Sequence, residues 1–266
     1  MDFAEILYSV QDDVATITLN RPQAMNSLTP EMADEVVRAL ETAQWDVNVR
    51  AIVITGAGRA FCAGANPRRI AADREQALQA QPPPLSQPAG LLYKVHRVVH
   101  TMDKPLIAAV NGAAAGGGLD LACAADIRFA SDRAKFASAF VRMGNVPAAG
   151  GAWFLPRMVG LANAYELIWT GKVVDAQEAY RIGLVSRVVP HDELMAATQE
   201  FALQLARGPT VAIRLAKRLV RRCAFLDLPA ALQATEEMAH ITRSTEDAQE
   251  GPRAWAEKRT PIYKGK

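Results

Sequence analysis

Two short, wholly apolar runs that each end in a glycine turn place the strongest limit on how this chain can fold. Residues 51–54 lead into Gly56, and residues 106–110 lead into Gly112. Short, continuous apolar runs bounded by turn residues are typical of strands that are buried on both faces, as in a parallel sheet. Helical patterns alternate with these runs, so the sequence predicts an α/β fold with right-handed β-α crossovers.

The first part of the chain has clear local signals. Two strand-like runs, 6–10 and 14–19, flank a polar turn and predict a hairpin. Thr29 followed by Pro30 is typical of a helix start, and the apolar spacing beyond them predicts a helix that ends near Trp45.

Later segments differ in character. A helix is expected over 91–102, and the proline-rich segment 81–88 before it is expected to be an inserted loop or lid. Helical patterns dominate from 161 to 255, apart from a strand-like run at 184–189. Because half of the 266 residues are hydrophobic, the chain can bury the core of one large domain, or of one domain with an appendage.

Composition excludes several classes of partner. Thirty basic against 28 acidic side chains leave a net charge near +2, which is too weak to indicate a nucleic-acid or anionic-membrane footprint. No apolar run reaches the length of a membrane span, and the first residues lack the pattern of a secretory signal. Three cysteines without CxxC spacing, Cys62, Cys123 and Cys223, argue against disulfides and structural zinc, so we expect a reducing, cytoplasmic location and no metal.

The glycine-rich segments 56–66 and 111–118 are the strongest candidates for a functional site. Each follows a predicted parallel strand, so both are expected at one end of the sheet, where free backbone amides can bind a negative charge. Two convergent amides of this kind can form an oxyanion hole. Tight packing between strand and helix is the structural alternative. A P-loop would need Lys-Ser/Thr after the glycines, and a dinucleotide fingerprint would need glycine where Phe61 stands.

Asp120 is the predicted acid/base. It follows Gly117 by three residues on an expected helix, which places it about one turn away on the same side. A carboxylate there can move a proton beside a bound thioester. Its alternative role is an acid that stabilises the helix N-terminus through the macrodipole.

The sequence resembles the crotonase (enoyl-CoA hydratase/isomerase) superfamily over nearly its whole length. The motifs that carry the resemblance are Asn20-Arg21-Pro22, Met25-Asn26-Ser27-Leu28, the stretches 49–65 and 104–112, Ala134-Lys135-Phe136, Leu155-Pro156-Arg157, Thr170-Gly171, Gly183-Leu184-Val185 and 245–251. The resemblance implies a spiral of ββα units over residues 1–200, with the acyl-CoA site, and a helical C-terminal trimerisation region over residues 201–266. It also implies self-association as a homotrimer or a dimer of trimers.

The family's site residues map onto this chain one by one. Its oxyanion donors correspond to the amides of Ala65 and Gly117. Its contacts with CoA correspond to the first glycine-rich loop, at Ala63, Asn66, Pro67 and Arg68. The resemblance implies no cofactor, because CoA enters as part of the thioester substrate.

The chain departs from the family where a second acid usually stands. Resembling hydratases have a glutamate at the position of Phe140, and a resembling isomerase branch has an aspartate at the position of Ala148. We interpret Phe140, Met143 and Trp153 as walls of an apolar acyl pocket, with plain core packing as the alternative. His96 and His100 lie one turn apart on the helix before the second strand; they are either site residues or a pair of surface histidines.

These observations together predict an acyl-CoA-processing enzyme that stabilises a thioester enolate, of the enoyl-CoA hydratase or isomerase type. Hydrolysis, decarboxylation or carbon–carbon cleavage on the same scaffold is the first alternative. A non-catalytic acyl-CoA-binding protein is the second.

Overall fold

A computed structural model describes residues 2–66, 69–72, 75 and 92–266 of the chain. The strands are β1 Ile6–Gln11, β2 Val14–Leu19, β3 Ala51–Gly56, β4 Ala60–Cys62, β5 Leu106–Val110, β6 Ala113–Ala115, β7 Ile127–Ser131, β8 Lys135–Ala137, β9 Val173–Asp175 and β10 Arg187–Val189. The helices are α1 Pro30–Trp45, α3 Tyr93–Thr101, α4 Gly117–Ala124, α5 Gly151–Thr170, α6 Ala176–Arg181, α7 Leu194–Ala206, α8 Thr210–Cys223, α9 Leu228–Arg243 and α10 Glu246–Ala256, with short 3₁₀ turns η1 Pro22–Ala24, η2 Val141–Met143 and η3 His191–Glu193.

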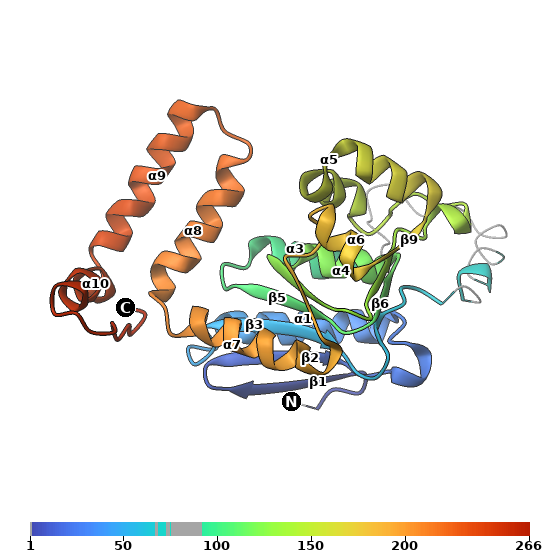
Figure 1. Cartoon of the computed structure of the whole chain (residues 1–266), viewed down its shortest axis with the longest axis horizontal. Helices are drawn as coiled ribbons and strands as arrows, with labels where there is room; N and C mark the ends of the chain where they lie inside the picture. Colours follow the sequence, from blue (N-terminus) through green and yellow to red (C-terminus); the bar gives the residue numbers. More distant parts are fainter. Residues whose placement is uncertain (1, 67–68, 73–74, 76–91) are drawn as a thin grey trace.

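The strands form two sheets, and the chain passes repeatedly from the larger sheet to the smaller one. The larger sheet has the order β1-β2-β3-β5-β7-β10, and the smaller one has the order β4-β6-β8-β9. The successive pairs β3–β4, β5–β6 and β7–β8 each place their first strand in the larger sheet and their second in the smaller one. Helices follow these pairs, so the described chain winds as a spiral of ββα units, as the resemblance implied (Figure 1).

The predicted hairpin and first helix are confirmed. β1 and β2 pair antiparallel from Ile6 with Leu19 to Gln11 with Val14. The Thr29 hydroxyl accepts a hydrogen bond from the Met32 amide at 3.0 Å and caps α1.

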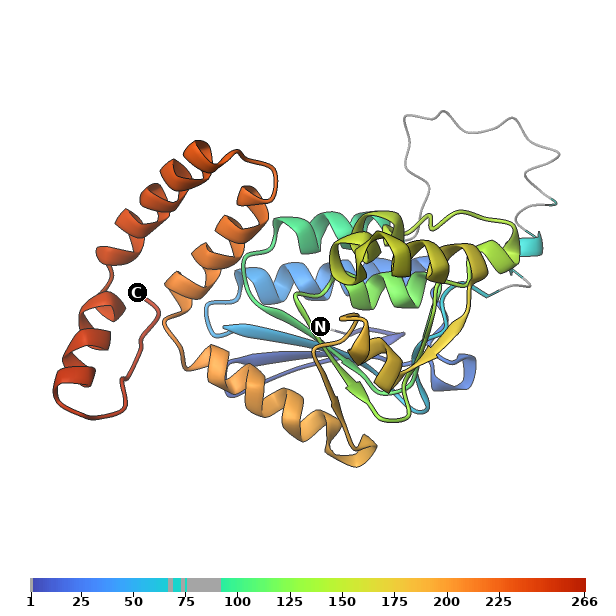
Figure 2. The same ribbon diagram turned by 45° about the horizontal axis from the view of Figure 1, so that its top comes forward.

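The apolar runs are buried on both faces, as predicted. Alternate residues of β3 point to opposite sides, because side chains alternate along a strand. Val53 packs with α7 on one side, whereas Ile52 and Ile54 pack into the core cluster that includes α1. Figure 2 shows α1 and α7 on opposite faces of the larger sheet. The sheet is therefore a rigid platform whose strand ends are fixed from both sides.

The C-terminal strand prediction needs correction. Only Arg187–Val189 of the predicted run 184–189 is a strand, and β9 was not predicted. Leu184 instead closes the end of α6, since its amide donates to the Ala179 carbonyl at 2.8 Å. Its burial explains the apolar pattern without a strand.

The helices α8, α9 and α10 extend beside the sheets rather than over them (Figure 1). The division of the chain after residue 200 stays a prediction; residue 200 lies within α7, which packs on the larger sheet. In the described part of the chain, no helix combines the length and apolar character needed to cross a bilayer.

A buried carboxylate holds α8 against the core. Asp103 accepts hydrogen bonds from Arg214 Nε at 2.9 Å and from Gln44 Nε2 at 2.9 Å, and it also pairs with Arg218. Burial alone would raise the Asp103 pKa, but the hydrogen bonds from Arg214 and Gln44 and the charges of both arginines outweigh it and lower the pKa to about 2.

Replacing this carboxylate is expected to destabilise the protein. Asp103→Asn should lower the free energy of unfolding at about pH 7 by about 1.5–3 kcal/mol, as for other hydrogen bonds to charged groups. A carboxyl group whose pKa is lowered by folding stabilises the folded protein above its pKa in the unfolded chain, about 4. This stabilisation is lost as pH falls toward the folded pKa of about 2. Urea denaturation should therefore show the difference from wild type shrinking between about pH 4 and pH 2. Asp34→Asn, which removes an exposed ion pair with Lys94, is the control and should change the stability little. Equal urea midpoints for Asp103→Asn and wild type at about pH 7 would contradict the prediction.

Candidate active site

The two glycine-rich loops meet at one end of the parallel strands. β3 and β5 are neighbours in register, with Ile54 opposite Ala108, so both chains leave the sheet at the same edge. Asn111 then ties the loops together: its side chain accepts from the Gly56 amide at 3.3 Å and donates to the Gly58 carbonyl at 2.9 Å. The expected convergence of the two loops is confirmed.

Glycines let the two backbones touch. A Cβ on Gly118 would lie 1.9 Å from the Cys62 carbonyl oxygen. A Cβ on Gly64, whose φ is +78°, would lie 2.5 Å from the Ala115 carbonyl oxygen and 3.2 Å from the Gly117 amide nitrogen. No side chain fits in either place, so this contact requires glycine.

Two amides beside this contact have no partner among the described residues. Leu28 and Ala65 form a parallel β-bridge in which the Leu28 amide donates to the Gly64 carbonyl at 2.9 Å. In this pairing the Ala65 N–H points away from Leu28. Gly117 is the first residue of α4, where an N–H has no acceptor within its own helix. The Leu28 side chain also packs against Gly117, 2.9 Å from where a Cβ would stand, so Leu28 contacts both residues that carry these amides. The pair can bind an oxygen that gains negative charge.

Asp120 lies on α4, one turn beyond Gly117, and is fully buried. Its Oδ2 accepts a hydrogen bond at 3.0 Å from the amide of Gly151, the first residue of α5, whereas Oδ1 is buried without a partner in the described structure. Burial raises the pKa of Asp120 to about 7, against the opposing effect of hydrogen bonds from the Gly151 and Ala149 backbone. A carboxyl group with this pKa can both accept and donate a proton near neutral pH.

Asp120 is compatible with both roles that the sequence left open. Its Oδ2 binds the N-terminus of α5 rather than that of its own helix. Its Oδ1 is buried and has no hydrogen-bond partner among the described residues. Gly151 is the reason that the carboxylate fits, because a Cβ there would lie 2.5 Å from Oδ1.

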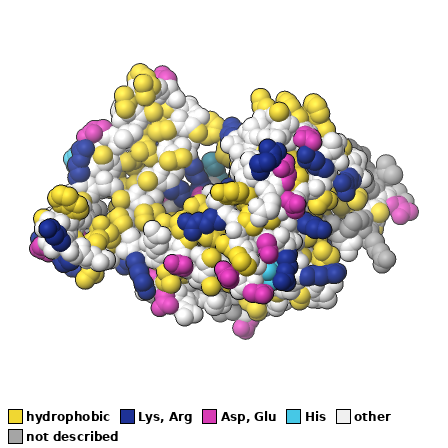
Figure 3. Space-filling model, viewed as in Figure 1, with side chains coloured by type: hydrophobic (Ala, Val, Ile, Leu, Met, Phe, Trp, Pro, Cys, Tyr) yellow, Lys and Arg dark blue, Asp and Glu magenta, His cyan; other side chains and the backbone are white. Residues whose placement is uncertain are grey.

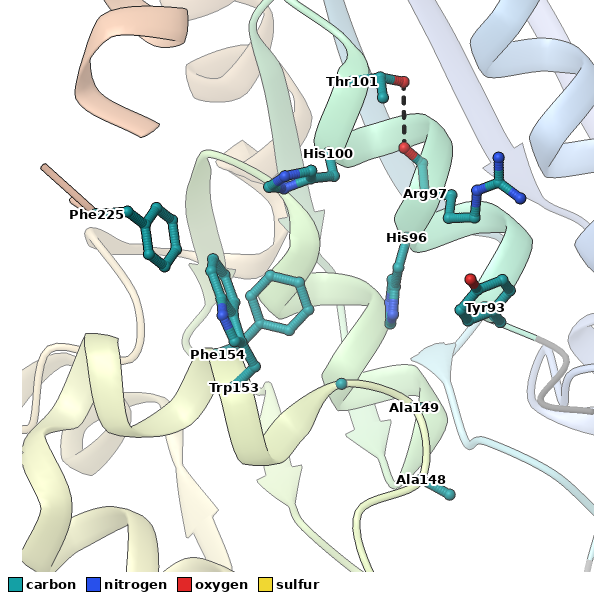
Figure 4. A pocket seen from close by; sticks show the side chains of 11 residues that line it. Tyr93, His96, Arg97, His100, Thr101, Ala148, Ala149, Trp153, Phe154 and Phe225 are labelled. Carbon is teal, nitrogen blue, oxygen red and sulfur yellow. Dashed lines mark hydrogen bonds between the residues drawn. The ribbon is translucent and has the colours of Figure 1, made fainter. Parts of the chain in front are cut away.

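A cavity of about 570 Å³ lies between α3 and the start of α5 (Figure 4). Asp120 does not line it, but Gly150 does, and the next residue, Gly151, donates its amide to Asp120. We call it the aromatic cavity; its lining residues are Tyr93, His96, Arg97, His100, Thr101, Ala148, Ala149, Gly150, Trp153, Phe154 and Phe225. Its volume is in the range of small-molecule sites.

Of the three predicted pocket residues, one lines this cavity. Trp153 forms part of its wall, whereas Phe140 and Met143 do not. Phe140 instead lies near the second glycine-rich loop, 4.0 Å from where a Cβ on Gly116 would stand, and Met143 is 41% exposed. Phe154 and Phe225 were not predicted: Phe154 is adjacent to Trp153 in sequence, but nothing in the sequence places Phe225 beside it.

The two histidines differ in environment. His96 is largely enclosed, and burial lowers its pKa to about 4 despite hydrogen bonding to the Asp120 backbone, so its ring is neutral at physiological pH. Its Nε2 has no hydrogen-bond partner in the described part of the chain. His100 is exposed and packs edge-on against Trp153, with ring centroids 6.4 Å apart. The surface interpretation therefore fits His100 and not His96.

The predicted CoA contacts are only partly within the described structure. Ala63 is held by a hydrogen bond from its amide to the Met25 carbonyl at 3.0 Å, and Asn66 lies exposed at the end of the loop. Pro67 and Arg68 lie outside the described residues. Among the residues that the structure does describe, no group of three or more His, Cys, Asp or Glu side chains could hold a metal ion.

Comparisons with known proteins agree with this architecture. The family model described as enoyl-CoA hydratase/isomerase matches residues 9–266. The chain is 35% identical to a 1,2-epoxyphenylacetyl-CoA isomerase of Escherichia coli over 98% of both chains, and 35% identical to a crotonyl-CoA hydratase of Syntrophomonas wolfei over 97% of both. It superposes on the crystal structure of an enoyl-CoA hydratase from Bacillus anthracis with a TM-score of 0.89, at 34% identity, covering 99% of this chain and 100% of that one. The expected fold is confirmed.

Proposed function

The chain belongs to the enoyl-CoA hydratase/isomerase family. On that premise we propose that it transfers protons to and from the carbon atoms of an acyl-CoA thioester, with the thioester enolate as the intermediate. The Ala65 and Gly117 amides hold the thioester oxygen, and Asp120 is the catalytic acid/base. The observation that carries the proposal is the free, buried Oδ1 of Asp120, one helical turn from the unpartnered Gly117 amide. Charge that develops on the oxygen is stabilised there without reorganisation of solvent.

Double-bond isomerisation fits a site with one acid/base best. In the shift of a 3-enoyl to a 2-enoyl thioester, the C2–H bond breaks, an enolate forms, and a proton is added at C4. A single carboxyl group can remove the first proton and supply the second. Phe140 and Ala148, at the positions of the family's second acids, offer no proton. Hydration is the second candidate, supported by the similarity to the crotonyl-CoA hydratase.

Liquid chromatography coupled to mass spectrometry separates the two reactions. Incubation with a 3-enoyl-CoA ester should give a product of unchanged mass that elutes with the 2-enoyl ester, whereas hydration of a 2-enoyl-CoA ester would add one water. In D₂O, deuterium should appear at C4 of the 2-enoyl product, and at C2 of recovered 3-enoyl ester if the enolate forms reversibly. Absence of both conversion and exchange, with tight binding of the esters, would favour a non-catalytic acyl-CoA-binding protein.

The rate should depend on the ionisation of Asp120. Because the carboxylate form removes the first proton, kcat/KM is expected to rise with pH, with a midpoint near the Asp120 pKa of about 7. Activity is then lost as pH falls below that value. Stopped-flow or steady-state rates across about pH 5–9 would measure the profile; a rate that falls with rising pH through this range would contradict the base role.

We further propose that the helical C-terminal region mediates self-association as a trimer or a dimer of trimers. Large apolar side chains are exposed on it, at Val220, Leu228, Leu232, Ile241, Trp255 and Ile262. Figure 3 shows hydrophobic side chains gathered over α8 and α9. Apolar surface of this extent is typical of an interface.

A charge on this surface should disrupt the assembly. Leu232 is 60% exposed, and Leu232→Glu is expected to lower the mass measured by analytical ultracentrifugation below that of the wild-type trimer or hexamer. Leu7→Glu, at a strand residue that is 54% exposed, is the matched control. A monomeric wild type would refute this part of the proposal.

The remaining proposals concern location and cofactors. The three cysteines are all free, which supports a reducing, cytoplasmic location. CoA arrives with the substrate, and we propose no separate cofactor.

A further inference from the structure

The lining of the aromatic cavity combines large aromatic side chains with very small residues. On one side, Trp153 packs edge-on against Phe154, with centroids 5.0 Å apart, and stacks on Phe225 at 6.5 Å and an interplanar angle of 24°. The small residues Ala148, Ala149 and Gly150, on the loop that leads into α5, also line the cavity. Small side chains in the lining leave room for a flat group.

The rings come from three separate segments. Trp153 and Phe154 lie on α5, Phe225 lies between α8 and α9, and Tyr93 begins α3. Trp153, Phe225 and Tyr93 each keep more than two fifths of their surface exposed, so ring faces and edges are open to a ligand. Aromatic ligands gain more than buried area from such rings, because offset and edge-on ring contacts add to it.

One polar atom in this cavity is buried and unpaired. His96 projects into the cavity from α3, packs edge-on against Phe154 at 5.4 Å, and has no partner at Nε2 in the described structure. The Thr101 hydroxyl, by contrast, donates to the Arg97 carbonyl at 3.2 Å. This nitrogen is already shut off from water without a ligand, and a buried polar atom without a partner is costly until a hydrogen-bonding group reaches it.

We propose that the aromatic cavity receives an acyl group that carries an aromatic ring, and that His96 Nε2 forms a hydrogen bond with an oxygen substituent on that ring. This inference rests on the proposed function and names its substrate class. Trp153 and Phe225 recognise the ring, and His96 recognises the substituent. Gly150 lines the cavity, and the amide of the next residue, Gly151, donates to Asp120, so we place the ring on the acyl side of the thioester. His96 is a specificity residue and takes no proton in the reaction.

Saturated thioesters test recognition apart from turnover. We would measure, by isothermal titration calorimetry, the binding of octanoyl-CoA, 3-phenylpropanoyl-CoA and 3-(4-hydroxyphenyl)propanoyl-CoA to the wild-type protein. The hydroxyphenyl ester is expected to bind about tenfold more tightly than the octanoyl ester, with the phenyl ester between them. Trp153→Leu and Phe225→Leu should each reduce the preference for a ring, while octanoyl-CoA binding changes little.

His96 is tested by a variant that keeps a ring. His96→Phe should bind the phenyl and hydroxyphenyl esters about equally, because the substituent loses its partner. Trp169→Leu is the matched control: Trp169 is also on α5 and exposed, but it stacks on Tyr165 and does not line the cavity. Circular dichroism checks folding, and Phe225, at an exposed loop, provides a second ring variant if Trp153→Leu does not fold.

Failure of this inference differs from failure of the proposed function. If octanoyl-CoA binds as tightly as the ring-bearing esters while enoyl-CoA turnover is intact, the ring-binding inference is wrong and the function stands. If His96→Phe keeps the full preference for the hydroxyl group, the role of His96 is overturned. If no thioester binds at all, both proposals fail.

Discussion

Asp120→Asn is expected to lower kcat by about 10²–10⁴-fold and to leave the binding of CoA esters nearly unchanged. Asparagine has the shape of aspartate, and its Oδ1 can still accept the hydrogen bond from Gly151, so the start of α5 keeps its position. Only the capacity to take and return a proton is lost. Single-turnover rates together with calorimetric binding of a saturated ester would separate the two effects.

The matched control is another aspartate that accepts a helix amide away from the cavity. Asp175 caps α6 through the Glu178 amide at 2.8 Å, and Asp175→Asn should retain wild-type kcat. Full activity of Asp120→Asn would remove Asp120 from the mechanism. A parallel loss of ester binding would indicate a structural role instead.

Asp120→Asn is not expected to lower the stability of the folded protein above neutral pH. Because the folded pKa of about 7 is raised from an unfolded value of about 4, the fold favours the protonated acid, and stability is lost as pH rises through 7. Asparagine carries no charge to bury. At about pH 8 the variant is therefore expected to unfold at a denaturant concentration equal to or higher than that of wild type, as is common for catalytic groups.

Gly118→Ala is expected to have the second large effect. The new Cβ would stand 1.9 Å from the Cys62 carbonyl oxygen and 2.7 Å from its carbon, so one of the two glycine-rich loops has to move. Overpacking of this kind costs about 1–3 kcal/mol or more, and a displacement of about 1 Å in a catalytic group can cost about 100-fold in rate. Thermal unfolding and kcat/KM should both decline.

Gly251→Ala controls for the loss of a glycine as such. Gly251 lies inside α10, and the nearest atom to its added Cβ is the Tyr263 hydroxyl at 3.3 Å. Alanine there should keep activity and leave stability equal or slightly higher, because glycine is unfavourable within a helix. If Gly118→Ala behaved like this control, the two loops would not need their close contact.

The two glycine-rich loops were predictable because their signals are local. Apolar runs such as 106–110 and the glycines that follow them predict buried strands and close backbone contact wherever they occur. The aromatic cavity was not predictable, since it joins Trp153 to Phe225 through the packing of α8 and α9. His96 was one of the candidate site residues, but its enclosure was not predictable: it neighbours Val95 on α3, and the enclosure depends on Phe154, which belongs to another helix.

The placement of Phe225 has an evolutionary consequence. The two glycine-rich loops, proposed to bind the thioester oxygen, follow central strands, whereas Phe225 lies on the connection between α8 and α9, and Asp103 anchors α8 to the core. Mutations in that connection can remodel one wall of the proposed acyl site without disturbing the strands or Asp120. Selection could thus change which acids a lineage consumes while inheriting the reaction intact.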